Sequence, residues 1–226
     1  MPPRHARSNP LALAVLTSLL EKPMHPYEVA QTLRGRAKHE SIRLNYGSLY
    51  GVVESLEKRQ FIRARETVRA GRRPERTTYE ITDTGTREMS DWLSELVATP
   101  TKEYLQFEAA LSLLPALPPD EALAGLRQRA ESLVVEIALV DGAVSAARFR
   151  GLPRLFALES EYVQALRRAE LDYVERLAKD IESGQLTGVD QWRSWYAPGG
   201  GRSEIDLVAT DEICAAHPSY PQTTTS

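Results

Sequence analysis

Residues 45–62 have the sequence Asn-Tyr-Gly-Ser-Leu-Tyr-Gly-Val-Val-Glu-Ser-Leu-Glu-Lys-Arg-Gln-Phe-Ile, and this stretch decides the fold class. Its apolar residues are spaced three and four apart, which predicts one buried stripe on a helix from about residue 46 to 59. The stripe consists of Leu49, Val52, Val53 and Leu56. The opposite face includes Gly47 and Gly51, and each glycine lowers helix propensity by about 1 kcal/mol relative to Ala. We therefore expect either another helix or a molecule outside the chain to approach this backbone closely.

The flanking sequence predicts the other elements of a winged helix-turn-helix domain over residues 9–98. Two helices come first, one after the Asn9-Pro10 cap and one from Pro26 to near Gly35. Two alternating segments follow, at 62–69 and 77–82, around a turn that contains Gly and Pro. A fourth helix begins at Thr82-Asp83 and ends before Pro100. The fold class is therefore mainly α, with a two-stranded wing.

The second half of the sequence predicts a helical dimerisation domain over residues 100–198. A heptad pattern runs through Leu123, Leu126, Ala130, Leu133, Ile137, Val140, Val144 and Ala147. After a break at Gly151-Leu-Pro153, a second series comprises Leu155, Leu158, Tyr162, Leu166, Ala169, Tyr173, Leu177 and Ile181. Two such helices predict an antiparallel hairpin, and its long apolar seam favours a second subunit. The alternative is an intramolecular three-helix packing. Residues 199–226 are expected to be a disordered tail.

Charge is divided unevenly along the chain. The formal net charge is −3, but residues 1–98 contribute +4 and the remainder contributes −7. Residues 34–76 alone contribute +7, which is typical of a segment that binds a polyanion, although a solvated basic surface has the same composition. The single cysteine, Cys214, excludes an internal disulfide and fits the cytoplasm. No apolar run reaches the ~18 residues of a membrane-spanning helix, so we expect no membrane association.

The third helix is predicted to enter the major groove of DNA, because recognition helices contact base edges with their N-terminal residues. The predicted contacts there are Asn45, Tyr46, Gly47, Ser48 and Tyr50. Four arginines near the wing turn are expected to reach the DNA backbone or the minor groove. These are Arg69, Arg72, Arg73 and Arg76.

At these residues the chain resembles the PadR family of bacterial transcriptional regulators. The matching segments are Leu16–Leu20, Met24–Val29, Asn45–Tyr50, Leu56–Ile62, Arg73–Arg76 and Tyr79–Gly85. The family commonly has glycine where this chain has Pro26, and many members have an aromatic residue where it has Thr78. The resemblance is specific over about residues 9–98 and weaker over the second half.

The resemblance implies a homodimer that binds a pseudo-palindromic DNA operator and represses transcription. Half-sites are then expected about one helical turn, or roughly 34 Å, apart. Family members often release DNA when they bind a small aromatic or hydrophobic effector. The aromatic residues that would line such a site are Trp92, Phe107, Trp192 and Trp195, although tryptophans at helical spacing also fill cores.

Two other function classes compete with a DNA-binding regulator. An enzyme is disfavoured, because the four histidines lack metal-ligand spacing and no nucleophile or phosphate-loop motif is present. We therefore predict no catalytic residues, no metal and no cofactor, and we expect His25 to cap or pack. A winged helix that contacts only other proteins remains the alternative.

Overall fold

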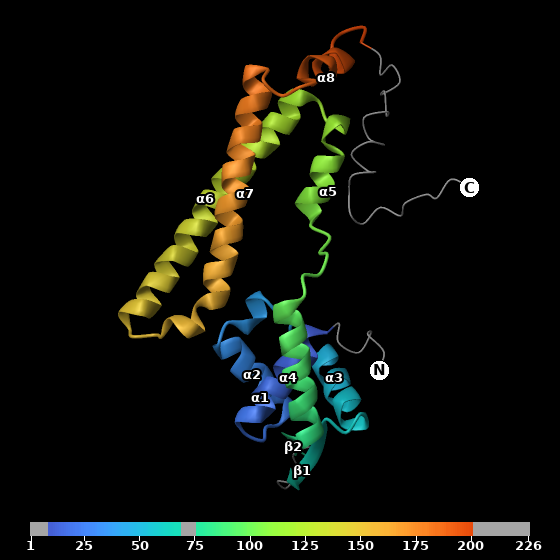
Figure 1. Ribbon diagram of the computed structural model, residues 1–226, viewed down its shortest axis with the longest axis vertical. Helices are drawn as coiled ribbons and strands as arrows, with labels where there is room; N and C mark the ends of the chain where they lie inside the picture. Colours follow the sequence, from blue (N-terminus) through green and yellow to red (C-terminus); the bar gives the residue numbers. More distant parts are fainter. Residues whose placement is uncertain (1–8, 69–75, 201–226) are drawn as a thin grey trace, which may run out of the picture. The chain divides into compact units, whose positions relative to one another are not determined.

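The computed structural model describes residues 9–68 and 76–200, which form two compact units. The first unit ends at Glu103 and the second begins at Tyr104 (Figure 1). The division falls beside the boundary expected between residues 98 and 100, while the functions assigned to the two domains stay predictions. The expected tail lies almost wholly outside the described residues. No helix in the described part of the chain combines the length and apolarity needed to cross a membrane.

The first unit has the predicted order of helix, helix, helix, hairpin and helix. Its helices are α1 (Pro10–Glu21), α2 (Pro26–Gly35), α3 (Tyr46–Lys58) and α4 (Asp83–Ala98), with a short 3-10 turn, η2 (Lys38–Glu40), between α2 and α3. The strands β1 (Ile62–Val68) and β2 (Arg76–Ile81) pair antiparallel as the wing. The predicted winged helix-turn-helix architecture is therefore confirmed, with mainly helical structure throughout.

The core of the first unit gathers around α1, which is apolar on all sides because α2, α3, α4 and β2 all pack against it. The predicted inner stripe of α3 is buried in this core, with Leu49 fully inaccessible to solvent. Asn9 and Thr82 cap α1 and α4 through their side-chain oxygens, as expected. His25 caps α2 by accepting the Tyr27 N–H at 3.1 Å, which confirms its predicted structural role.

The wing is anchored to the core at its base. The Thr82 hydroxyl donates to the Gln60 carbonyl at 2.8 Å, and Gly85 packs directly beneath the Phe61 carbonyl. Ala64 pairs with Tyr79, two positions along from the Ile62–Ile81 pair, and it is exposed because the strand has already left the core there. A β-bulge follows between Ala64 and Glu66.

The second unit is a long antiparallel hairpin with short helices at one end (Figure 1). Its long helices are α6 (Pro119–Phe149) and α7 (Leu158–Ser183), joined through the 3-10 turn η4 (Arg154–Phe156). The shorter elements are α5 (Gln106–Ser112), η3 (Leu114–Ala116) and α8 (Val189–Tyr196). The Trp192 indole N–H donates to the Leu117 carbonyl at 2.9 Å, which ties α8 to the start of α6. The predicted hairpin is thus confirmed, with α8 folded back onto it.

Candidate nucleic-acid interface

Helix α3 begins at a side-chain cap that the sequence placed among the DNA contacts. The Asn45 carbonyl oxygen accepts the Gly47 N–H at 2.9 Å, which satisfies one of the free amide groups of the first helical turn. The side-chain amide nitrogen of Asn45 takes no part in this cap, and the residue is exposed. Asn45 therefore defines where the helix starts and still presents a hydrogen-bond donor to solvent.

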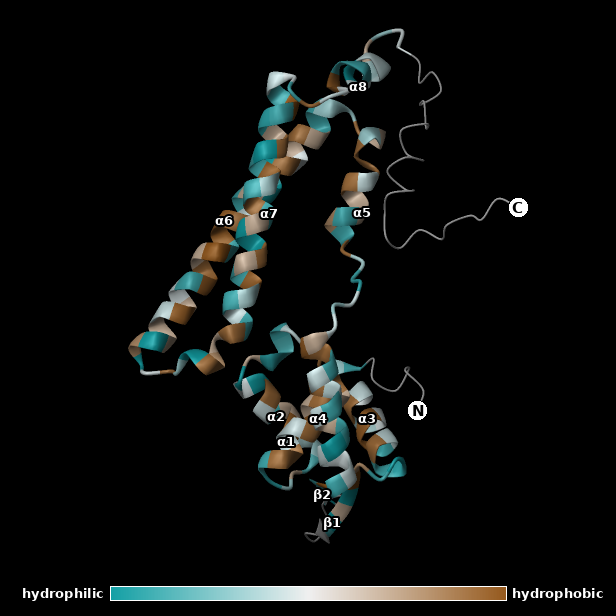
Figure 2. Cartoon of the chain, viewed as in Figure 1, coloured by the Kyte–Doolittle hydropathy of each residue, from teal (hydrophilic) through white to brown (hydrophobic). Residues whose placement is uncertain are grey.

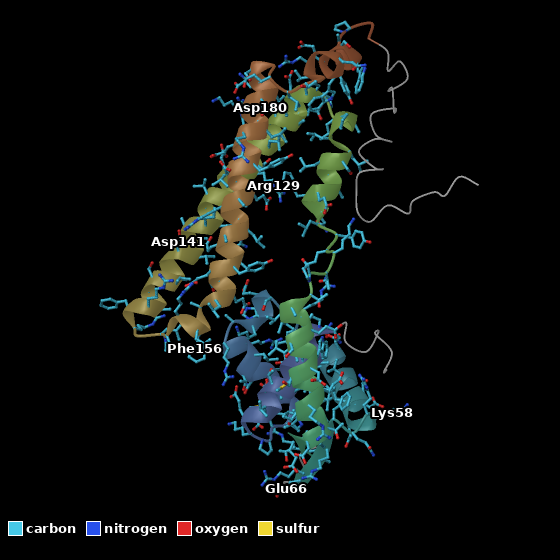
Figure 3. The ribbon with its side chains drawn as sticks, in the orientation of Figure 1. Lys58, Glu66, Arg129, Asp141, Phe156 and Asp180 are labelled. Carbon is cyan, nitrogen blue, oxygen red and sulfur yellow. The ribbon has the colours of Figure 1, made fainter. Side chains whose placement is uncertain are left out.

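The outer face of α3 is open to solvent over its whole length. Its exposed residues are Gly47, Ser48, Tyr50, Gly51, Glu54, Ser55 and Lys58. A Cβ atom built on Gly51 would meet no other atom within 4 Å, and one on Gly47 would meet only the Asn45 side chain at 3.5 Å. No helix packs on these glycines, so the expected close approach has no partner among the described residues. Lys58 lies near the end of this helix (Figure 3).

Tyr46 and Tyr50 differ in their surroundings, although the sequence grouped them together. Tyr50 is exposed to 49% and lies on the outer face of α3. Tyr46 is half-buried, and its hydroxyl accepts a hydrogen bond of 2.6 Å from Arg34 of α2. Its ring also stacks on that of Tyr27, with centroids 6.2 Å apart. Tyr46 therefore belongs to a contact between α2 and α3, whereas Tyr50 makes no side-chain hydrogen bond or ring contact with the described residues.

The wing supplies one described arginine from the predicted set. Arg76 is exposed at the start of β2, close enough to His25 for its charge to lower the pKa of that imidazole, after the larger effect of burial. Arg69, Arg72 and Arg73 lie outside the described residues. Along the strands, Arg63 and Arg65 both pair with Glu80, which partly neutralises the wing below its turn.

The other basic side chains of the first unit include both ion-paired and unpaired ones. Arg36 is held by Glu21 through two hydrogen bonds. By contrast, Arg43, Lys58 and Arg76 are exposed and have no acidic partner among residues 9–68 and 76–200. Arg43 precedes α3 and Lys58 is its last residue, and the sequence did not identify either as a candidate phosphate contact. The positive charge of residues 34–76 pointed to them, but only the structure separates paired from unpaired side chains.

The four aromatic residues predicted to line an effector site lie in two different cores. Trp92 is buried in the core of the first unit, where its indole N–H finds no acceptor in the described structure. Phe107, Trp192 and Trp195 all pack into the core of the second unit. Phe107 is covered by the Arg129 guanidinium, 3.8 Å from the ring centroid, and Arg129 in turn pairs with Glu170. A single site lined by all four is not present within either unit.

Among the described residues, no group of three His, Cys, Asp or Glu side chains is placed to hold a metal ion. Comparison with the curated proteins finds no match. Residues 15–91 match the model of the family described as "Transcriptional regulator PadR-like family". This stretch contains α2, α3, both strands of the wing and most of α1 and α4.

Solved structures share the fold of about three quarters of this chain at low sequence identity. Bacillus subtilis PadR in complex with operator DNA is 17% identical with a TM-score of 0.62, over 75% of this chain and 97% of that one. The same protein in complex with p-coumaric acid has a TM-score of 0.61 at 17% identity, over 76% and 98%. The Vibrio cholerae virulence activator AphA has a TM-score of 0.56 at 14% identity, over 76% and 98%.

These comparisons confirm the resemblance stated from the sequence and the prediction of a DNA-binding regulator rather than an enzyme. The family match covers the winged-helix unit, and the structural matches extend the shared fold into the hairpin. Over residues 15–91, the chain is similar to the PadR-like family of transcriptional regulators.

Proposed function

We propose that this chain is a sequence-specific repressor that inserts α3 into the major groove of a pseudo-palindromic operator as a homodimer. The observation that carries the proposal is the outer face of α3, where a Cβ atom added to Gly51 would meet no atom within 4 Å beyond the backbone of its own helix. A glycine there costs helix stability and serves no packing against the described residues, so it makes room for an external partner. A B-DNA major groove about 12 Å wide admits such a helix.

The predicted contacts take distinct roles in this proposal. Ser48 and the Asn45 amide lie at the N-terminus of α3, where they can meet base edges or phosphates. Gly47 and Gly51 allow close approach, and the Tyr50 hydroxyl suits a phosphate. Arg76, with Arg69, Arg72 and Arg73, would contact the backbone or the adjacent minor groove from the wing.

The case for a dimer rests on the half of the hairpin near η4, where α6 has apolar side chains on two opposite faces. The predicted heptad residues of α6, such as Leu133, face α7. Val135 and Leu139 lie on the opposite face of the same helix and are exposed, Leu139 to 68%. Brown, apolar stretches recur along the ribbon of α6 in Figure 2. A helix that is apolar on opposite faces needs partners on both sides.

In the half of the hairpin near η4, helix α7 has a polar residue on its inner face and apolar residues on its outer face. Gln164 is buried between the helices and donates to the Ile137 carbonyl at 2.9 Å, while Arg168 pairs with Asp141, which is labelled in Figure 3. The predicted apolar series of α7 instead faces outward over most of its length, with Tyr162 exposed to 66%. Helix α8 cannot cover this surface, because it packs at the other end of the hairpin. This supports a second copy of the chain over the intramolecular three-helix packing.

We also propose that a small aromatic or hydrophobic compound regulates DNA binding. Bacillus subtilis PadR has been solved with p-coumaric acid, and it shares the fold of both units. In this chain, Phe107, Trp192 and Trp195 gather in one core and are the better candidates to line an effector site. Trp92 lies in the separate core of the first unit. The virulence activator AphA shares this fold, so the fold alone does not decide between repression and activation.

Gel-shift titration at several salt concentrations tests DNA binding. The probe is the best duplex that the wild-type protein selects from a random-sequence pool. A regulator of this kind gives a shift that depends on sequence and weakens with salt, because bound phosphates release counterions. Tyr50→Phe is expected to weaken binding without changing the thermal unfolding curve. A winged helix that contacts only proteins would select no duplex, and unchanged affinity of Tyr50→Phe would argue against the assigned groove face.

A further inference from the structure

One side chain of α2 holds the first residue of the recognition helix, and no interpretation of the DNA-binding face from sequence included it. The Arg34 guanidinium lies 4.5 Å from the centre of the Tyr46 ring. Its Nη1 also donates to the Tyr46 hydroxyl oxygen at 2.6 Å. Arg34 thus contacts both the ring and the hydroxyl of one tyrosine, which combines a cation–π contact with a charge-assisted hydrogen bond.

A second tyrosine fixes the Tyr46 ring from another position on the same helix. Tyr27 stacks on Tyr46 with an interplanar angle of 13°, and Gln31 donates to the Tyr27 hydroxyl at 3.0 Å. Tyr27, Gln31 and Arg34 are spaced four and three residues apart, so they share one face of α2. Tyr46 directly follows the Asn45 cap, so this face of α2 contacts α3 at its first residue.

This cluster is not part of the apolar core. Tyr27, Gln31 and Arg34 are all exposed, and Tyr46 only packs against the edge of the core that buries Leu49. The folding of α3 is already accounted for by its buried stripe and its cap. An exposed arrangement of three rigid or charged groups around one tyrosine is therefore better explained by what the tyrosine does at the surface.

The hydrogen-bond chemistry indicates that role. A tyrosine hydroxyl has one proton to donate and lone pairs to accept with, whereas a phosphate oxygen can only accept. When Arg34 donates to the Tyr46 oxygen, the hydroxyl proton is left to point elsewhere, and the adjacent positive charge makes it a stronger donor. At the start of α3, where free N–H groups already favour anions, a DNA phosphate is the acceptor that fits.

We propose that Arg34 is a positioning residue, which acts through Tyr46 to present the Tyr46 hydroxyl to a phosphate of the bound operator. The inference rests on the proposed DNA-binding function. It adds a phosphate contact made by Tyr46 of α3 and supported by Arg34 of α2. It assigns the DNA contact to Tyr46 as the sequence did, and it assigns the control of that contact to α2.

Fluorescence anisotropy with the duplex selected by the wild-type protein tests the proposal. Tyr46→Phe and Arg34→Ala are each expected to weaken binding about tenfold to a hundredfold, the loss typical of one hydrogen bond to a charged group. The double variant is expected to bind no more weakly than either single variant, because both remove the same contact. Arg34→Lys should also bind weakly, since a lysine keeps the charge but lacks the planar group that lies on the ring.

Arg36→Ala is the matched control. It removes the same charge two residues further along the chain, from an arginine that pairs with Glu21. It is expected to leave affinity close to the wild-type value. Thermal unfolding of every variant, with binding measured well below the transition, separates positioning from a loss of folded protein.

Two results would overturn the proposal while leaving DNA binding intact. If Arg34→Ala lowers the salt slope by about 0.9 and Tyr46→Phe binds normally, Arg34 itself contacts the phosphate. If the losses of the single variants add in the double variant, the two side chains act independently. Failure of the wild-type protein to select any duplex would instead refute the proposed function.

Discussion

The two units of the chain differ in how completely they bury their apolar side chains. In the winged-helix unit, α1 is surrounded by α2, α3, α4 and β2, and the face of α3 left outside is polar or glycine. In the hairpin, the half near α8 has an apolar interior, whereas the half near η4 has Gln164 inside and Leu139 and Tyr162 outside. Phe156, labelled at that end in Figure 3, is also exposed.

This difference indicates what each surface is for. An open face made of small and polar groups, as on α3, can bind a hydrated and charged partner without a large cost when it is free. An open apolar face is costly in water at about 25 cal/mol per Å² and is normally covered. The outer face of α3 therefore suits a partner that binds reversibly, and the outer apolar face of the hairpin suits a permanent partner.

The largest loss of stability is expected at the base of the wing, where Gly85 packs against the backbone of Phe61. A Cβ on Gly85 would lie 2.0 Å from the Phe61 carbonyl oxygen, which is backbone and cannot rotate away. Gly85→Ala should therefore lower the free energy of unfolding by about 3 kcal/mol or more, measured by urea denaturation. A stability loss below about 1 kcal/mol would show that the base of the wing can shift and that the unit is less tightly closed than described.

A pair of leucines on α6 compares the inner and outer faces of the hairpin. Leu133 is exposed to only 7%, and Leu133→Ala should cost about 2–3 kcal/mol of stability at any protein concentration. Leu139→Ala should instead make stability and molecular mass depend more strongly on concentration, because it weakens association between subunits. Light scattering after size-exclusion chromatography measures the mass. Equal, concentration-independent effects of both variants would refute the outward dimer face.

Gly51→Ala separates folding from DNA binding on α3. Because a Cβ there meets nothing within 4 Å, the variant should be about 0.5–1 kcal/mol more stable than the wild type, through higher helix propensity. The same methyl group would narrow the approach to DNA and weaken operator binding in a gel-shift titration. A variant that is more stable and binds equally well would leave the glycine without a role at the DNA.

The smallest effect concerns pH and the cap of α2. Burial, followed by the charge of Arg76, lowers the pKa of His25 below the ordinary value of 6.5. Since the unfolded chain binds this proton more readily than the folded chain, the contribution of His25 to stability is complete above pH 6.5 and declines as the pH falls towards the folded pKa. The proton would also occupy the Nδ1 atom that accepts the Tyr27 N–H.

His25→Asn keeps a cap acceptor but cannot titrate in this range. Thermal unfolding between about pH 5 and pH 7.5 should therefore show a shallower loss of stability in the variant than in the wild type. Parallel profiles for the two proteins would mean that the His25 imidazole titrates alike in the folded and unfolded chains.

The sequence alone determined the order of elements in the first unit, the stripe of α3 and the hairpin of the second unit. Local causes suffice there, since a cap such as Asn9 or Thr82 and the spacing of Leu49 and Leu56 act within a few residues. The resemblance to PadR regulators came from the same local motifs. Glycines on the outer face of α3 were likewise visible before the structure showed that nothing packs on them.

Tertiary structure decided which partner each surface meets. The periodic series of α7 identified a stripe, but periodicity carries no information on whether that stripe faces α6 or solvent, and Tyr162 faces solvent. The sequence likewise could not pair Arg34 with Tyr46, twelve residues away, or show that Arg36 is neutralised while Arg43 is not. Such contacts depend on how helices pack in space, because side chains distant in sequence meet only after the backbone has closed.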